Sequence, residues 1–224
     1  MHTAKGCITE IYLDGRRAAR LSCPPALIPA PGKYLLAHDA TDFNSPLPHP
    51  IYSAGTAPGG FYLTPPIPPN WQPGTELTLR GPLGHGFSLP ESARFVALAA
   101  FGSTSARLLA LLEPALAQKA AIVLLTDYPP AGLPSAVEIS RLSALPETAH
   151  WADYFAIDLP HFSMETVLKS NAQHLNSVNA QVFIETPVPC GGMADCGVCA
   201  VRSRKGYQLA CKDGPVFDVK QLIA

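Results

Sequence analysis

The sequence predicts a multi-domain protein of β plus α/β class, with a β-barrel, a small parallel α/β domain and a cysteine-rich carboxyl-terminal domain. Three observations predict it. Fifteen of the 24 prolines lie between Pro24 and Pro90, strand and helix patterns alternate from about Glu91, and four of the six cysteines follow residue 189. The expected domain boundaries are 1–89, 90–186 and 187–224.

Composition sets the broad class of the protein. With 47% hydrophobic and 15% charged residues, the chain of 224 residues is expected to be compact and globular. A formal net charge of -1 predicts no polyanion-binding face, so nucleic acid is not expected as a partner. The sequence has neither a signal-like start nor a long uncharged apolar run, which predicts a cytoplasmic protein that makes no membrane contact.

The amino-terminal region is read as a small β-barrel. Proline lacks a backbone donor and is tolerated at strand edges and in turns, so the apolar runs between prolines predict short strands joined by irregular loops. These runs are ITEIYL, KYLLAH, GFYLT and ELTLR.

The middle region predicts a parallel sheet. FVALAA, AIVLLTD, YFAID and QVFIE are apolar runs typical of strands buried on both faces, and VEIS predicts a further short strand. Helices are expected over SARLLALLEPALAQ, with Pro114 kinking or splitting it, and over FSMETVLKS. Ser103, Thr104 and Ser105 are expected to cap the first of these helices. Alternating strands and helices imply crossover connections and hence a parallel sheet.

The carboxyl-terminal cysteines have the spacing of an iron-sulfur site. Two irons bridged by two sulfides need four thiolates, which a loop and one distant cysteine can supply together. The candidate ligands, separated by five, two and eleven residues, are Cys190, Cys196, Cys199 and Cys211. Glycines between them, at positions 191, 192 and 197, allow the tight curvature that points backbone N–H groups at a cluster. The segment has little apolar core of its own and should dock on its neighbour, with a hairpin around Lys205–Gly206.

Four cysteines can also hold a structural zinc ion or form disulfides. Structural zinc sites usually take two Cys-x-x-Cys pairs, whereas here only Cys196 and Cys199 form such a pair. Disulfides are disfavoured in a reducing compartment. The prediction is therefore a [2Fe-2S] cluster, with structural zinc as the weaker alternative.

Two motifs carry a resemblance to a known family. CGGMADCGVC followed by LACKDGPVFDVKQL resembles the carboxyl end of the iron-sulfur, flavin-carrying electron-transfer subunit of bacterial dihydroorotate dehydrogenases. GPLGHGF, residues 81–87, is similar to that family's motif at the end of its barrel. The family usually has four residues between its first two ligands, and this sequence has five.

The resemblance implies a ferredoxin-reductase-like fold and one-electron transfer in pyrimidine biosynthesis. It implies a partner, the FMN-carrying catalytic subunit of a dihydroorotate dehydrogenase, and it implies no acid or base from this chain, so no catalytic residue is assigned. It also implies FAD. The positions that match the family's flavin contacts are Tyr52, Ser53, Gly81 and Pro82.

The nucleotide elements depart from the family pattern. The arginine expected before the Tyr-Ser pair is absent from HPIYSAG, and LTPPIPPNW replaces a glycine-threonine turn with prolines that have no N–H to offer phosphate. AAFGSTSARLL keeps only Gly102 of a glycine run, which disfavours NAD binding. Two readings stay open: an FAD-carrying electron-transfer subunit, or a divergent iron-sulfur relay or binding module that has lost both nucleotide sites.

Overall fold

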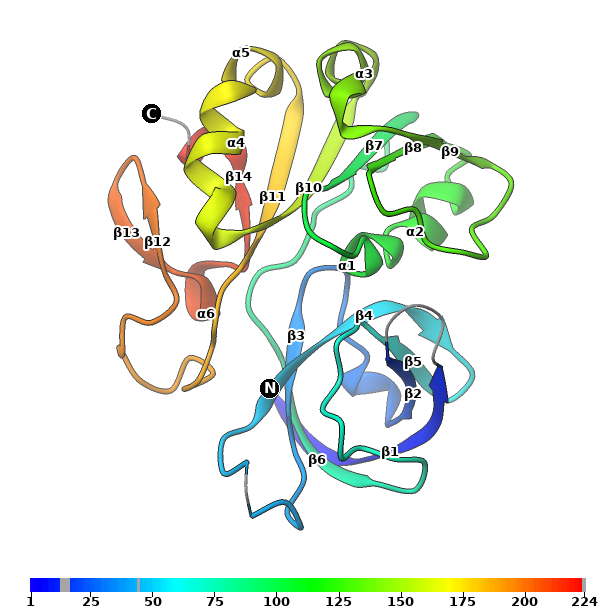
Figure 1. Ribbon diagram of the computed structural model, residues 1–224, viewed down its shortest axis with the longest axis vertical. Helices are drawn as coiled ribbons and strands as arrows, with labels where there is room; N and C mark the ends of the chain where they lie inside the picture. The colour runs from blue at the N-terminus through cyan, green and yellow to red at the C-terminus, as the bar shows by residue number, and fades with distance from the viewer. Residues whose placement is uncertain (13–16, 44, 223–224) are drawn as a thin grey trace.

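The protein has two stacked halves with the carboxyl-terminal segment against one side (Figure 1). The computed structural model describes residues 1–12, 17–43 and 45–222. One half is a closed antiparallel barrel with strand order β1-β2-β5-β4-β3-β6. The strands are β1 (His2–Tyr12), β2 (Ala18–Ser22), β3 (Tyr34–His38), β4 (His49–Ala57), β5 (Gly60–Leu63) and β6 (Glu76–Leu83). The barrel class and the four predicted strands are confirmed, while Leu13 of the first run lies outside the described residues.

Alternate residues of the barrel strands fill its interior. Leu77 and Leu79 on β6 and Ala19 and Leu21 on β2 have no exposed surface, and Trp71 is 1% exposed. Period-two alternation places the intervening residues at the surface. The barrel therefore has a core of its own, separate from the two cores that flank the sheet.

The other half is built on a six-stranded sheet with order β14-β11-β10-β7-β8-β9. All neighbouring strands are parallel except β14, which runs antiparallel to β11. The strands are β7 (Phe95–Ala100), β8 (Ala121–Thr126), β9 (Val137–Ser140), β10 (Tyr154–Pro160), β11 (Asn179–Glu185) and β14 (Val216–Asp218). All five predicted strands of this region are confirmed.

Helices cover both faces of the sheet, as the continuous apolar runs predict. Val96 and Leu98 of β7 pack with α1 and α2, whereas Ala97 and Ala99 pack with α3, α4 and α5. The helices are α1 (Ala106–Leu109), α2 (Leu112–Ala117), α3 (Leu145–Trp151), α4 (Met164–Ser170) and α5 (Ala172–Leu175), with short 3-10 turns η1 (Pro25–Leu27), η2 (Leu142–Ala144) and η3 (His161–Ser163). Within the described residues, no helix combines the length and apolar character needed to cross a bilayer.

The first helix is split, but ahead of the proline expected to split it. The break falls between α1 and α2, and Pro114 is the third residue of α2, where its missing N–H removes no intrahelical hydrogen bond. Thr104 accepts a hydrogen bond through its Oγ1 from the Ala106 N–H, at 3.1 Å. Ser105 makes no such side-chain bond. Ser105 is the cap residue of α1 and makes no capping bond, so the capping expectation is wrong, and Thr104 instead binds the first N–H of the helix from the position before the cap.

The carboxyl-terminal segment packs onto the sheet. It contains β12 (Ala200–Ser203), β13 (Gly206–Leu209), α6 (Ala210–Asp213), β14 and α7 (Val219–Leu222). The predicted hairpin is present as β12 and β13. Val201, Phe217 and Val219 belong to the same apolar cluster as one face of the sheet, which confirms that the segment docks on its neighbour.

Core packing on this face of the sheet predicts the cost of one truncation. Phe155 has no exposed surface, so Phe155→Ala should lower the free energy of unfolding by about 3–5 kcal/mol, measured by urea unfolding. Phe162, which is 89% exposed, is the matched control. Phe162→Ala should change the free energy of unfolding by less than about 0.5 kcal/mol. Equal losses in the two variants would contradict this packing.

Candidate functional site

The four clustered cysteines come from two places in the chain and lie as two close pairs. Cys190, Cys196 and Cys199 are on the loop between β11 and β12, and Cys211 is in α6. The Sγ atoms of Cys190 and Cys196 are 3.6 Å apart, and those of Cys199 and Cys211 are 3.2 Å apart. The fold thus places Cys211 beside the cysteines of the loop.

The sulfur distances fit thiols that share metal centres rather than disulfides. All six cysteines are free, and a disulfide would bring two sulfurs to about 2.05 Å. Two thiolates on one tetrahedral centre with metal–sulfur bonds of about 2.3 Å lie about 3.8 Å apart, close to the 3.6 Å of the first pair, while the 3.2 Å of the second pair is shorter. In the part of the chain that the structure describes, no group of three or more His, Cys, Asp or Glu side chains converges on the position of a single ion.

The two pairs differ in their exposure to solvent. Cys199 and Cys211 are buried, whereas Cys190 is half-buried and Cys196 is exposed. Backbone hydrogen bonding within the loop, strongest at Ala194, lowers the pKa of the Cys190 thiol to about 7. Burial raises the pKa of Cys211 to about 12, and the neighbouring Cys199 and Cys190 thiols add to this effect. The buried pair is thus in an apolar environment, and the other pair reaches the surface.

Glycines give the loop its curvature, as the sequence predicts. Gly191, Gly192 and Gly197 have φ values of 53°, 79° and 74°, a region that glycine adopts without steric cost. At Gly191 a Cβ would lie 2.1 Å from Cδ1 of Leu36 on β3. This glycine therefore also permits the loop to touch the barrel.

The barrel holds the cysteine loop with an arginine. Arg80 of β6 donates from its Nη2 to the backbone oxygen of Gly191, at 3.3 Å, and its Nη1 lies 2.8 Å from Sδ of Met193. Met193 itself is 66% exposed. The loop is anchored at its base, while its tip faces solvent.

The two motifs that suggested the family resemblance contact each other. The backbone N–H of His85, in GPLGHGF, donates to the Gly214 oxygen at 2.5 Å, and the Val216 N–H donates to the His85 oxygen at 3.3 Å. Gly84 lies at this contact, and a Cβ there would be 2.5 Å from the Gly214 oxygen. These two stretches, far apart in sequence, form one junction between the barrel and α6.

The four residues matched to flavin contacts are engaged within the protein. Tyr52 packs edge-on against Phe183 with ring centroids 5.1 Å apart, and burial raises its pKa. Ser53 is buried, and its Oγ donates to the Gly55 oxygen and accepts from the Gly55 N–H. Gly81 lies against the barrel wall, where a Cβ would be 2.6 Å from Leu35 Cδ2, and Pro82 follows it in β6.

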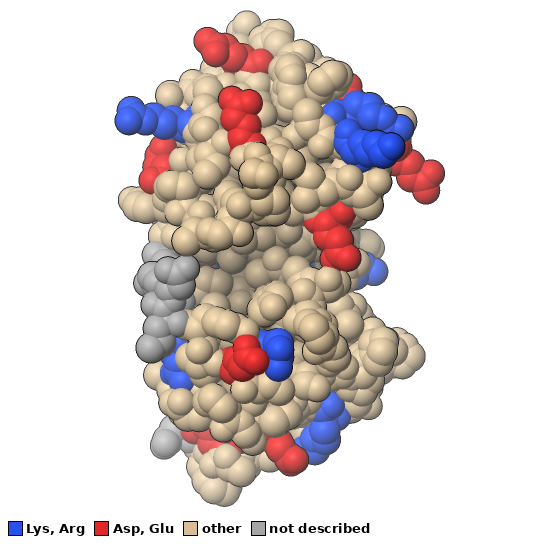
Figure 2. Space-filling view, turned by 90° about the vertical axis from the view of Figure 1, so that its right-hand side faces the viewer, with Lys and Arg blue, Asp and Glu red and all other residues tan. Residues whose placement is uncertain are grey.

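The space beside Tyr52 is lined by prolines on one side. A cavity of ≈190 Å³ is lined by Tyr52, Arg107 and Thr186, together with Pro65, Pro66 and Pro68, and an adjoining cavity of ≈480 Å³ shares Pro66 and Pro68 with it. Prolines supply no N–H to a phosphate, so the donor set on this side of the cavity does not fit FAD held as in the resembling family. Figure 2 shows a hollow between the two halves with mostly uncharged surface around it.

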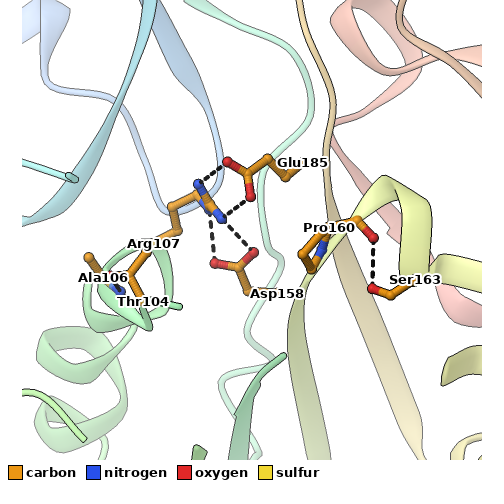
Figure 3. Close-up of polar contacts among 7 residues, drawn as sticks. All are labelled: Thr104, Ala106, Arg107, Asp158, Pro160, Ser163 and Glu185. Carbon is orange, nitrogen blue, oxygen red and sulfur yellow. Dashed lines mark hydrogen bonds and ion pairs between the residues drawn. The ribbon is translucent and has the colours of Figure 1, made fainter. Parts of the chain in front are cut away.

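An ion cluster with two buried members, Arg107 and Asp158, and one exposed member, Glu185, lies at the edge of the sheet beside this cavity (Figure 3). Arg107 of α1 donates from its Nε and Nη2 to the two oxygens of Asp158, at 2.8 and 3.0 Å. It also donates from its Nη1 and Nη2 to Glu185, at 3.3 and 2.9 Å. Burial is the largest single influence and lowers the pKa of Arg107, but the charges and hydrogen bonds of Asp158 and Glu185 together outweigh it and raise this pKa. The Arg107 guanidinium also lies over the Phe183 ring, 4.9 Å from its centroid.

Sequence reasoning missed this cluster, although a signal was present. Asp158 and Glu185 each come at or near the end of a strand read from an apolar run, YFAID and QVFIE. Because the carboxyl ends of parallel strands meet at one edge of a sheet, two such carboxylates predict a shared cation. The expected nucleotide-binding turn around Gly102 leads into the helix that supplies Arg107.

Solved structures with a similar fold include several reductases. An NADH-dependent reduced ferredoxin-NADP oxidoreductase, solved for insights into flavin-based electron bifurcation, matches with a TM-score of 0.73 and 16% identity over 99% of this chain and 90% of that chain. The ferredoxin reductase in carbazole 1,9a-dioxygenase matches with a TM-score of 0.59 and 15% identity, over 78% of this chain and 65% of that chain. At such identities the likeness shows the fold, which is ferredoxin-reductase-like. No curated protein sequence matches this chain.

A further solved structure repeats the fold of the two larger parts. The flavohem-like FAD/NAD binding domain of nitric oxide dioxygenase from Vibrio cholerae matches with a TM-score of 0.54 and 16% identity, over 81% of this chain and 98% of that domain. Residues 189–223 match the sequence profile of a family described as the iron-sulfur cluster binding domain of dihydroorotate dehydrogenase B. All four paired cysteines lie within that match. The carboxyl-terminal segment of this chain, which has a ferredoxin-reductase-like fold, is therefore similar to the iron-sulfur cluster binding domain of dihydroorotate dehydrogenase B.

Proposed function

We propose that this chain is an electron-transfer protein that carries a [2Fe-2S] cluster on Cys190, Cys196, Cys199 and Cys211. The observation that carries the proposal is the arrangement of these cysteines as two adjoining pairs, at 3.6 and 3.2 Å. A cluster with two irons needs two thiolates on each iron. When bound, such a cluster accepts and gives up one electron at a time.

The chain's own residues would hold the cluster asymmetrically. Cys199 and Cys211 lie in the apolar cluster that spans the sheet face and the carboxyl-terminal segment. Cys196 and its neighbours Met193 and Val198 are exposed. Electron exchange with a partner is therefore expected at the Cys190–Cys196 side, and the buried side shields the cluster from water.

The partner proposed is the FMN-carrying catalytic subunit of a dihydroorotate dehydrogenase, in pyrimidine biosynthesis. The family match over residues 189–223 supports it. Exposed apolar side chains next to the cysteines, Met193 and Val198, supply a surface of the kind that protein partners cover. One electron would pass from the partner's reduced flavin to the cluster, and a second redox group would take it onward.

The residues between the barrel and the α/β half support an iron-sulfur relay without a bound nucleotide rather than an FAD-carrying subunit. Arg107 pairs with two carboxylates, so the cluster it forms has no net positive charge to offer a pyrophosphate. The prolines that line the cavity beside Arg107 point the same way, because they have no N–H to offer a phosphate. We therefore propose that the barrel and the α/β half act as a scaffold for the cysteine segment.

Metal and cofactor content tests the proposal directly. Anaerobically purified protein should absorb in the visible and contain two irons and two sulfides per chain, without stoichiometric flavin or zinc. Cys211→Ser should remove most of this iron and absorbance, because it takes one thiolate from the buried pair. Cys7→Ser, outside the segment, is the matched control and should keep both. One zinc per chain and no sulfide would refute the electron-transfer proposal.

The proposed docking face can be tested without disturbing the cluster. Met193→Glu and Val198→Glu should weaken binding to the FMN-carrying catalytic subunit by about tenfold or more, because a charge would replace an apolar contact. A carboxylate at position 193 keeps an attractive contact with Arg80, so the loop stays anchored. Iron content should stay unchanged. Tyr128→Lys serves as the control, since Tyr128 is 64% exposed and lies in the β8–β9 connection on the other side of the molecule (Figure 1). Unaltered binding in both loop variants would exclude this face.

Substitution of Arg107 tests whether the crevice between the two halves is structural or binds a ligand. If its task is to pair with the buried Asp158, Arg107→Met should cost about 3–5 kcal/mol in the free energy of unfolding, since a carboxylate is left without its counter-charge. Arg94, exposed and bound to backbone oxygens, gives the control variant Arg94→Met, which should cost far less. A stable Arg107→Met protein that loses a bound nucleotide would instead support the FAD-carrying subunit.

A further inference from the structure

One tyrosine of the barrel reaches the cysteine segment. Tyr34, the first residue of β3, has no exposed surface, and its hydroxyl donates to the backbone oxygen of Cys211 at 2.9 Å. Both groups are buried, and they are 177 residues apart in sequence. A buried hydrogen bond of this kind is expensive to break, because the carbonyl left behind has no water to replace its partner.

The Tyr34 ring is fixed from two sides. Gly84 borders one edge of the ring, and a Cβ there would lie 3.0 Å from Cε1 of Tyr34. The Tyr52 ring lies on another side with its centroid 6.0 Å away. Because Phe183 in turn packs against Tyr52, the hydroxyl position is set by the packing of the barrel against the sheet.

The backbone around Cys211 is anchored on both sides of the same residue. The Ala210 N–H donates to the Cys199 oxygen at 3.0 Å, which ties the two buried cysteines together. Beyond Cys211, the Gly214 oxygen accepts from the His85 N–H. Tyr34 binds the peptide between these anchors, so its hydroxyl determines how the carbonyl next to the buried cysteine pair is directed.

We propose that Tyr34 is a positioning residue that orients the Cys211 peptide and raises the reduction potential of the cluster. The inference rests on the proposed function, that is, on a cluster bound through Cys211. Reduction adds one negative charge to the cluster, and the Cys211 carbonyl oxygen carries a partial negative charge in a poorly solvated place. The hydroxyl hydrogen of Tyr34 offsets that partial charge, and hydrogen bonds around the ligands are an established means of tuning such potentials.

The test compares two tyrosine-to-phenylalanine variants of the full-length, cluster-loaded protein. Tyr34→Phe removes one oxygen atom and keeps the ring. Tyr154→Phe is the matched control, because Tyr154 is also fully buried and its hydroxyl donates to Gln181 Oε1 at 2.7 Å, within the sheet. The measurements are iron and sulfide content, the electron paramagnetic resonance spectrum of the reduced protein, and the midpoint potential from an anaerobic dye-mediated titration.

The expected result is a full cluster in both variants, with a more negative midpoint potential and an altered reduced-state spectrum in Tyr34→Phe alone. A Tyr34→Phe protein with an intact cluster and the wild-type potential would overturn the inference and leave the proposed function standing. Equal shifts in both variants would overturn it as well, since they would reflect a general loss of stability. Wild-type protein that holds no iron and sulfide would overturn both proposals.

Discussion

The cysteine site depends on the junction between one barrel loop and one short terminal segment. Three of the four paired cysteines share a loop, but Cys211 meets them only because its segment is held in place. His85 binds the backbone on the far side of Cys211, and β14 pairs with β11 just beyond it. Tyr34 binds the Cys211 carbonyl itself. The barrel therefore belongs to the site in a structural sense although it brings no cysteine to it.

The crevice between the two halves lies at the carboxyl ends of the parallel strands. In open α/β sheets, ligands bind beyond the carboxyl ends of the parallel strands. Here that edge carries Asp158 and Glu185, and Arg107 satisfies both. The Arg107 guanidinium is thus already paired at the position where the protein would have to offer a positive charge to a negatively charged ligand. Retention of the fold alongside altered nucleotide elements is understandable if the barrel and sheet serve to position the carboxyl-terminal segment.

The parts of this protein that were predictable from sequence are those with local signals. Strands β7, β8, β10 and β11 are buried on both faces and read as unbroken apolar runs. The cysteine spacing and the glycines between the cysteines mark the metal segment. Strands β2 and β4 were missed, because AARLS has a weak pattern and β4 contains Pro50 near its start. The contacts of Arg107 and Tyr34 join residues 51 to 177 positions apart. The carboxylates at two strand ends predict a shared cation but do not identify Arg107, and no local pattern predicts the contact of Tyr34.

The antiparallel strand β14 has a consequence for how the protein is made. It lies at the edge of a sheet whose other strands are all synthesised earlier, and Cys211 emerges only just before it. Amino-terminal parts of a chain fold first during synthesis. The barrel and the parallel strands can therefore be in place while the site is still one thiol short. The order of synthesis thus makes the four-cysteine site one of the last parts of the described fold to be completed.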